Sequence, residues 1–144
     1  MRFVPSLAWT AVVLLLGSVY FGADHTGAAL APFLRALAPW LGLRSWELHA
    51  LVRKAAHVTE YAALAGLWFY ALSRRSALVA SWIALSICLV CAFADETHQS
   101  WLPNRTASAR DVVIDSVGAV AALSLVRRRR ERLDARALAP VRTA

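Results

Sequence analysis

The sequence predicts an all-α, polytopic membrane protein with four transmembrane helices, and three observations support this prediction. Of the 144 residues, 59% are hydrophobic and 17% are charged, whereas a soluble domain usually has about 45–50% apolar and about 25% charged residues. The mean hydropathy is +0.51. Four segments are also apolar for close to the ~20 residues that a helix needs to cross a bilayer.

The four predicted spans follow one another along the whole chain. The first covers about residues 7–23 and is interpreted as an uncleaved anchor, because Phe21 stands where a signal-peptide cleavage site needs a small residue. The second covers about 52–72 and begins with charged residues. The third covers about 77–94, and the fourth, which is short, covers about 111–126.

A short interfacial segment is predicted between the first two spans. Pro32 and Pro39 argue against one continuous helix there, because an internal proline removes a backbone hydrogen bond. Trp40 and Trp46, together with several apolar residues, indicate a segment that lies on the membrane surface.

The distribution of basic residues predicts the orientation. Four crossings place both termini on one side, and that side carries ten of the sixteen basic residues. The positive-inside rule therefore predicts that both termini are cytoplasmic. Residues 127–144 hold seven arginines against two acids and are predicted to be a basic cytoplasmic tail, which follows a single four-helix membrane domain of residues 1–126. The tail lacks interleaved aromatic residues and follows an apolar run directly, which favours anionic lipid over nucleic acid as its partner.

The second span carries a polar face. Lys54, His57 and Tyr61 are three and four residues apart and share one stripe of a helix, and Glu60 lies one turn after His57 and slightly to the side. These groups would occupy the outer third of the membrane. An ionisable group within a span costs roughly 2.5–3.5 kcal/mol on insertion scales, so it normally faces other helices and finds a partner there.

The fourth span offers such partners. Asp111 and Asp115 are four residues apart on one helix face, and the small residues Gly118 and Ala122 continue that face. Small residues allow a neighbouring helix to approach closely. We therefore expect the polar face of another span to lie near the two aspartates.

These groups predict a polar pocket that faces outward, at the outer membrane face. The end of the third span and the start of the fourth add further polar side chains to it: Asp95, Glu96, Gln99, Arg105 and Arg110. A salt-bridge network that only clamps the helices together is the competing interpretation.

In a ligand site, the basic and the acidic side chains of the pocket would have different roles. Lys54, Arg105 and Arg110 would hold phosphate oxygens, with Tyr61, Asp95, Gln99 and the remaining acids lining the site. A divalent cation is a possible cofactor, with Glu96, Asp111 and Asp115 as candidate ligands. In an enzymatic version, His57, Glu60 and Asp111 would supply general acid–base catalysis. No nucleophile stands beside a base in the sequence pattern, so whether the chain is an enzyme stays open.

Three motifs resemble the VanZ-like family of bacterial membrane proteins: "RKAAHVTEYAAL", "DETHQSWLPNR" and "RDVVIDSVGAV". The family pattern combines Lys-x-x-His with a Tyr four residues later, an acidic pair before x-His-Gln, a Pro-Gly-Arg turn, and Asp-x-x-x-Asn-x-x-Gly. The resemblance covers about residues 52–122 with order and spacing kept. Asn104 replaces the usual Gly of the turn, and Asn also tolerates a left-handed conformation. Asp115 stands where the family usually has Asn, which adds a carboxylate.

The resemblance implies a protein of the bacterial inner membrane and cell envelope, in a family named for resistance to the glycopeptide antibiotic teicoplanin. The function expected from the polar pocket is binding of an anionic lipid or a lipid-linked cell-wall precursor by its headgroup, with membrane lipids as partners and no nucleic acid. The alternatives are an enzyme acting on a lipid headgroup, and a structural or assembly partner. Neither the ligand nor the oligomeric state follows from the sequence.

Overall fold

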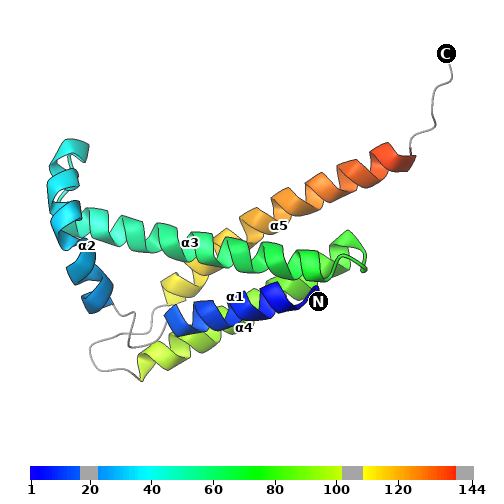
Figure 1. Ribbon diagram of the computed structural model, residues 1–144, viewed down its shortest axis with the longest axis horizontal. Helices are drawn as coiled ribbons and strands as arrows, with labels where there is room; N and C mark the ends of the chain where they lie inside the picture. The colour runs from blue at the N-terminus through cyan, green and yellow to red at the C-terminus, as the bar shows by residue number, and fades with distance from the viewer. Residues whose placement is uncertain (17–22, 102–108, 139–144) are drawn as a thin grey trace, which may run out of the picture.

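The computed structural model describes residues 1–16, 23–101 and 109–138, and all regular structure in these ranges is helical (Figure 1). The side chains of residues 23–29, Gln99 and Ala109 also lie outside the description. The predicted all-α class is therefore confirmed. The elements are α1 (Val4–Leu16), α2 (Ala23–Leu37), the 3-10 helix η2 (Ala38–Leu41), α3 (Ser45–Ala71), α4 (Ala77–Ser100) and α5 (Ala109–Leu138).

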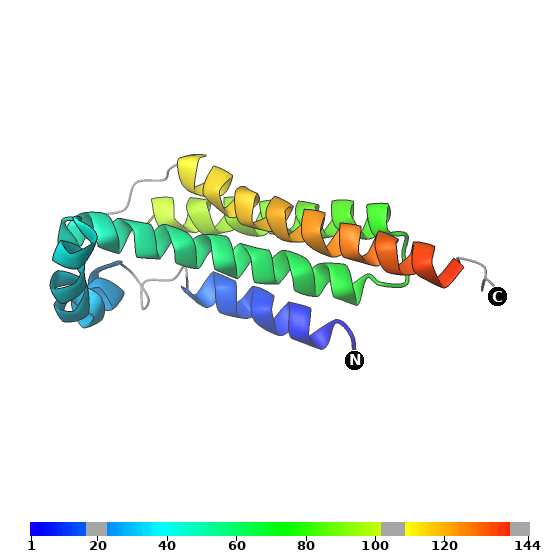
Figure 2. The ribbon, with the colours of Figure 1, turned by 90° about the horizontal axis from the view of Figure 1, so that it is seen from above.

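Helices α3, α4 and α5 form the centre of the structure. A short turn joins α3 to α4, so these two helices run in opposite directions, and α5 crosses over both (Figures 1 and 2). Helix α1 lies along α3, where the indole of Trp68 donates a hydrogen bond to Thr10 Oγ1 at 3.1 Å. Helix α2 and η2 turn away from this group at the beginning of α3.

The shared core consists mainly of small residues. Ala65 of α3, Ala84 and Cys88 of α4, and Ala119 of α5 are each at most 1% exposed. Small side chains let helix backbones approach closely, which is how helices associate where lipid removes the usual hydrophobic drive. The packing of the three helices therefore depends on close backbone contact as well as on large side chains such as Leu64.

One helix in the described part of the chain is both long and apolar enough to cross a bilayer, the stretch Ala77–His98 of α4. Only 28% of its most apolar window is buried inside the protein. Val90 and Phe93 are each 69% exposed on this helix, and Val117 of α5 is 58% exposed. Apolar side chains exposed on such a scale are typical of a surface that lipid or another protein covers.

The segment predicted to be interfacial differs from the expectation at one of its prolines. The segment is not one continuous helix, as predicted, but Pro32 lies inside α2, whose helix continues to Leu37, so the interruption does not occur at this proline. Proline already has a φ close to the helical value, so its cost there is one lost hydrogen bond and local crowding. The break occurs instead around Pro39, where η2 begins, and the chain leaves η2 through Gly42 at a left-handed φ of 67°.

Helix α3 starts earlier than the predicted second span. It begins at Ser45, and its first turn is stabilised by Glu47, whose carboxylate accepts hydrogen bonds from the backbone N–H of Arg44 at 2.8 Å and from its guanidinium at 2.9 Å. These two bonds hold the pKa of Glu47 below its usual value. The charged residues that follow therefore lie within a continuous helix and not at its frayed end.

Helix α5 extends well beyond the predicted end of the fourth span. It continues through residues 126 and 127, where composition places the start of the basic tail, and ends at Leu138. Arg127 and Glu131 pair at 2.7 Å, and Arg130 and Asp134 lie 3.8 Å apart, both at the four-residue spacing that supports a helix. The first part of the predicted tail is thus a helical continuation of α5.

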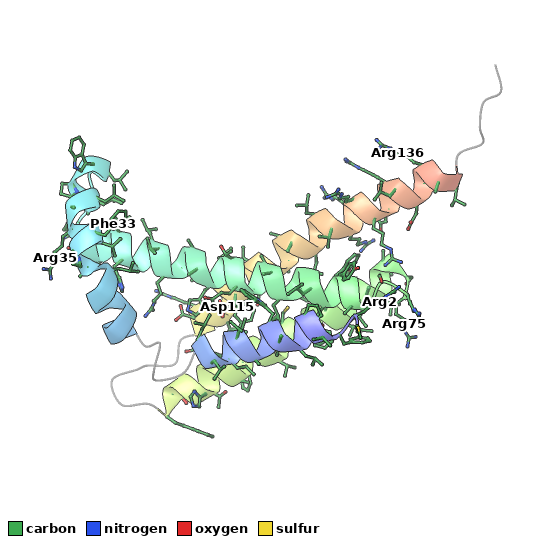
Figure 3. All side chains as sticks on the ribbon, viewed as in Figure 1. Arg2, Phe33, Arg35, Arg75, Asp115 and Arg136 are labelled. Carbon is green, nitrogen blue, oxygen red and sulfur yellow. The ribbon has the colours of Figure 1, made fainter. Side chains whose placement is uncertain are left out.

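Several of the basic residues gather at one end of the helix bundle. Arg2 donates a hydrogen bond to Ser73 Oγ at 3.1 Å, and Arg130 donates to the backbone oxygens of Ser73 and Arg75, each at 2.9 Å. The start of the chain, the α3–α4 turn and the beginning of the tail therefore lie together, with Asp115 away from them toward the middle of the structure (Figure 3).

Candidate functional site

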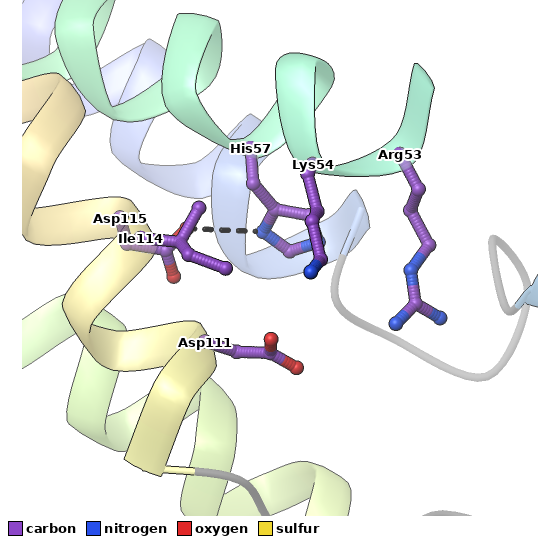
Figure 4. A pocket seen from close by; sticks show the side chains of 6 residues that line it. All are labelled: Arg53, Lys54, His57, Asp111, Ile114 and Asp115. Atoms are coloured by element: carbon purple, nitrogen blue, oxygen red, sulfur yellow. Dashed lines mark ion pairs between the residues drawn. The ribbon is translucent and has the colours of Figure 1, made fainter. Parts of the chain in front are cut away.

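The candidate site is a small hollow between α3 and α5. Three basic or titratable side chains reach toward it from α3, and two carboxylates and an isoleucine face them from α5 (Figure 4). The residues that line it are Arg53, Lys54, His57, Asp111, Ile114 and Asp115. The structure thus brings together four of the predicted site residues: Lys54, His57, Asp111 and Asp115.

A glycine determines how closely these two helices approach. A Cβ atom on Gly118 would lie 3.0 Å from both the carbonyl carbon and the Cα of Val58, and closer still to the carbonyl oxygen of Val58. The backbone of α3 therefore rests directly on Gly118, as the run of small residues on this face predicts. His57 precedes Val58 and Asp115 lies one turn before Gly118, so this contact places their side chains side by side.

His57 and Asp115 form the buried part of the site. His57 Nδ1 lies 3.2 Å from Asp115 Oδ1, and the two side chains are 30% and 5% exposed. The contact does not meet the geometric criteria of a hydrogen bond, so both atoms keep unused hydrogen-bonding capacity among the described residues. A carboxylate this deeply buried is costly unless a partner compensates its charge. His57 is the partner that the structure provides.

Glu60 and Tyr61 lie next to this pair without lining the hollow. Glu60 is partly buried, and its backbone oxygen accepts a hydrogen bond from the indole of Trp9 at 3.1 Å. Tryptophans near the ends of spans are usually membrane-surface anchors, but the structure gives Trp9 a partner inside the bundle. Tyr61 is 1% exposed, and its hydroxyl has no hydrogen-bond partner among the described residues.

The acidic pair of α4 approaches the site from the third helix. Asp95 is 6% exposed and lies near His57 and Tyr61. Glu96 is partly buried. Arg110, at the beginning of α5, has an exposed side chain. Arg110, Asp95 and Glu96 each interact with another group of the protein.

Two of the predicted site residues lie outside the part of the chain that the structure describes. Arg105 belongs to residues 102–108, and the side chain of Gln99 is also not described. The candidate metal ligands Glu96, Asp111 and Asp115 are described, but in residues 1–16, 23–101 and 109–138 no three His, Cys, Asp or Glu side chains are grouped so that they could hold a metal ion. The divalent-cation site therefore stays a prediction.

The hollow is too small to enclose a headgroup. The volume that the centre of a water molecule can occupy in it is about 10 Å³, so the hollow has room for about one water molecule. A larger ligand would therefore meet the site at its rim, where the exposed side chains of Arg53 and Lys54 stand. The arrangement combines a cationic rim with a buried His–Asp pair beneath it.

Arg53 is the residue that sequence reasoning misses as a member of the site. In the sequence it counts only among the basic residues that predict orientation. Its spacing contains the signal, because Arg53 and His57 are four residues apart and four-residue neighbours share one face of a helix.

Comparison with known proteins agrees with the motifs. The sequence matches the VanZ/LLP1 family over residues 4–130, from the first turn of α1 into the basic part of α5. No curated protein and no solved structure matches it. The family match spans most of the chain and includes all of α3, α4 and the α3–α5 crossing. Together with the exposed apolar surface of α4, it identifies the chain as a membrane protein that belongs to the VanZ/LLP1 family.

Proposed function

We propose that this VanZ-like protein binds the anionic headgroup of an envelope lipid or lipid-linked cell-wall precursor at the outer membrane face, and that it thereby affects sensitivity to glycopeptides of the teicoplanin type. The observation that carries the proposal is the exposed pair Arg53 and Lys54 at the rim of the α3–α5 hollow. Arginine and lysine donate charge-assisted hydrogen bonds to phosphate oxygens, and these are among the stronger polar contacts that proteins make.

The proposed topology has four crossings, made by α1, α3, α4 and α5, with both termini in the cytoplasm. At 1.5 Å per residue, the 27 residues of α3 and the 30 residues of α5 extend over ~40 and ~45 Å, more than the ~30 Å hydrocarbon core. Their charged ends can therefore leave the lipid. The gathering of Arg2, Arg75 and Arg130 at one end supports a cytoplasmic assignment for that end, and the hollow then lies toward the outer leaflet.

The buried pair gives the rim a fixed position. Asp115 lies beneath the rim cations, and His57 lies against it. Asp111, on the same face of α5, is partly buried and lines the same hollow. In the proposal these acids keep the side chains of Arg53 and Lys54 oriented toward α5, and a phosphate competes with them for the two cations.

Lipid analysis of the purified protein tests the binding. Lys54→Gln and Arg53→Gln should each reduce the amount of co-purified phosphorylated lipid by about tenfold, which corresponds to the loss of one charge-assisted hydrogen bond. Arg35→Gln is the matched control, because it removes one positive charge from exposed surface on α2, away from the hollow. Equal lipid content in all three variants would contradict the proposal.

An enzymatic role is the second candidate, and the His57–Asp115 contact favours it. A carboxylate that orients a histidine is the arrangement by which many enzymes prepare a general base. His57→Gln separates the two roles: a catalyst loses product formation but keeps bound lipid, whereas a binding protein without chemistry keeps both its lipid and its effect on teicoplanin sensitivity.

A purely structural network is the remaining alternative, and it has a distinct outcome. If His57 and Asp115 only hold α3 against α5, Asp115→Asn would lower the thermal stability and leave both lipid content and teicoplanin sensitivity unchanged. This variant keeps the shape of the side chain while it removes the charge. Asn is also the family's usual residue at this position.

A further inference from the structure

A second cavity lies at the opposite end of the bundle from the α3–α5 hollow. It is formed between the first residues of the chain and the turn that joins α3 to α4, and its volume is about 400 Å³. Three of the residues that line it are arginines, Arg2, Arg74 and Arg75, and its apolar lining includes Phe3 and Leu72. It therefore combines cationic side chains with apolar surface in a space of the size that small-molecule pockets have.

The positive charge of this cavity is not neutralised by nearby acids. No acidic residue lines it in the described part of the chain. The two acids at this end, Glu131 and Asp134, lie on α5 and pair with the arginines of that helix. Within the described residues, Arg74 and Arg75 form no ion pair, and both side chains are exposed.

The walls of the cavity are held in place by contacts of their own. The guanidinium of Arg130 donates to the backbone oxygens of Ser73 and Arg75 at 2.9 Å each, which ties the α3–α4 turn to α5. Arg2 donates to Ser73 Oγ at 3.1 Å and links the start of the chain to the same turn (Figure 3). Phe3 packs against Trp68, with ring centroids 6.2 Å apart.

We propose that this cavity binds the phosphate of an anionic phospholipid from the leaflet on the side of the termini. Arginine's planar fork of N–H donors matches two oxygens of one phosphate. Two neighbouring arginines would also repel the choline cation of phosphatidylcholine, so they favour a headgroup with a net negative charge. The apolar residues beside them suit the first methylene groups of an acyl chain. This site is separate from the α3–α5 hollow, and it stands whether or not the hollow binds a ligand.

Native mass spectrometry of the full chain in detergent tests the site. The protein is titrated with phosphatidylglycerol and, separately, with phosphatidylcholine. The double variant Arg74→Gln/Arg75→Gln should lose about tenfold or more in affinity for phosphatidylglycerol, since hydrogen bonds to charged groups are among the stronger ones. The double variant Arg128→Gln/Arg129→Gln is the matched control, because it removes two adjacent, exposed arginines at the same end but outside the cavity.

Each outcome has a clear meaning. Selective binding of phosphatidylglycerol that survives in the control and is lost in the cavity variant supports the site. Equal losses in both double variants would show a diffuse charge effect and overturn it, as would equal affinity for the two lipids. Affinity for inorganic phosphate equal to that for phosphatidylglycerol would identify a site for free phosphate and overturn the lipid assignment.

Two further variants keep the test independent of folding and of the outer site. Arg2→Gln removes the third cavity arginine from a different segment and should weaken phosphatidylglycerol binding in the same direction. Lys54→Gln should leave this binding unchanged, because Lys54 lines the hollow at the other end. A loss in Lys54→Gln equal to that in Arg74→Gln/Arg75→Gln would place the lipid elsewhere and overturn the inference.

Discussion

Replacing Gly118 with alanine tests the contact on which the α3–α5 site depends. The new methyl group would lie 3.0 Å from the Cα and carbonyl carbon of Val58 and closer to its carbonyl oxygen. These are backbone atoms, so no side chain can rotate away to make room. The two helices would have to separate, and His57 and Asp115 would be pulled apart with them.

The size of the effect follows from two opposing terms. Overpacking of a tight contact costs about 1–3 kcal/mol, whereas replacing a helical glycine with alanine gains about 1 kcal/mol in helix propensity. We therefore expect Gly118→Ala to lower the free energy of unfolding by up to about 2 kcal/mol. The net effect is destabilising because the new methyl group meets backbone atoms, which can shift less than side-chain atoms can.

Gly66→Ala in α3 is the matched control. A Cβ on Gly66 meets no atom within 4 Å, so this variant keeps the propensity gain and has no overlap to relieve. The difference between the two variants isolates the cost of the overlap, expected at about 1–3 kcal/mol. It is measured by SDS unfolding in mixed detergent micelles, followed by circular dichroism. If Gly118→Ala were as stable as Gly66→Ala, the close approach of α3 and α5 would be refuted.

Two further predictions concern α1 and the start of α3. Trp9→Phe removes the indole donor to the backbone oxygen of Glu60 and should cost about 0.5–1.5 kcal/mol of stability in the same assay. Trp82→Phe is the control and should cost less, because Trp82 is 63% exposed. Equal losses of stability in the two variants would contradict an internal role for Trp9. The pKa of Glu47 is lowered, so the bonds from Arg44 should stabilise the first turn of α3 above the usual glutamate pKa of 4.5 and be lost as the pH falls through the lower pKa of the folded protein. Carbon-13 NMR should find this midpoint below 4.5 and Arg44→Ala should raise it, whereas an unchanged midpoint would speak against the cap.

The candidate site could be predicted in part because helical spacing is a local property. Residues three or four apart share a face, so the amino-acid sequence alone groups Lys54 with His57 on one helix and Asp111 with Asp115 on another. The same rule applied to Arg53 adds it to the first group. The helix ends were less predictable, because the ion pair of Arg127 with Glu131 prolongs α5 through a segment that composition alone separates as a tail.

What the sequence by itself determined is the helical class, the apolar character of α4, the uneven distribution of basic residues and the faces on which the polar groups lie. Which carboxylate meets His57 was decided only by the tertiary structure, because spacing along a helix does not specify how that helix is rotated toward its neighbours. The contact of Gly118 with Val58 sets this rotation, and it places Asp115 against His57. The arginine-lined cavity likewise requires the start of the chain and the α3–α4 turn to meet, and they are about seventy residues apart in the sequence.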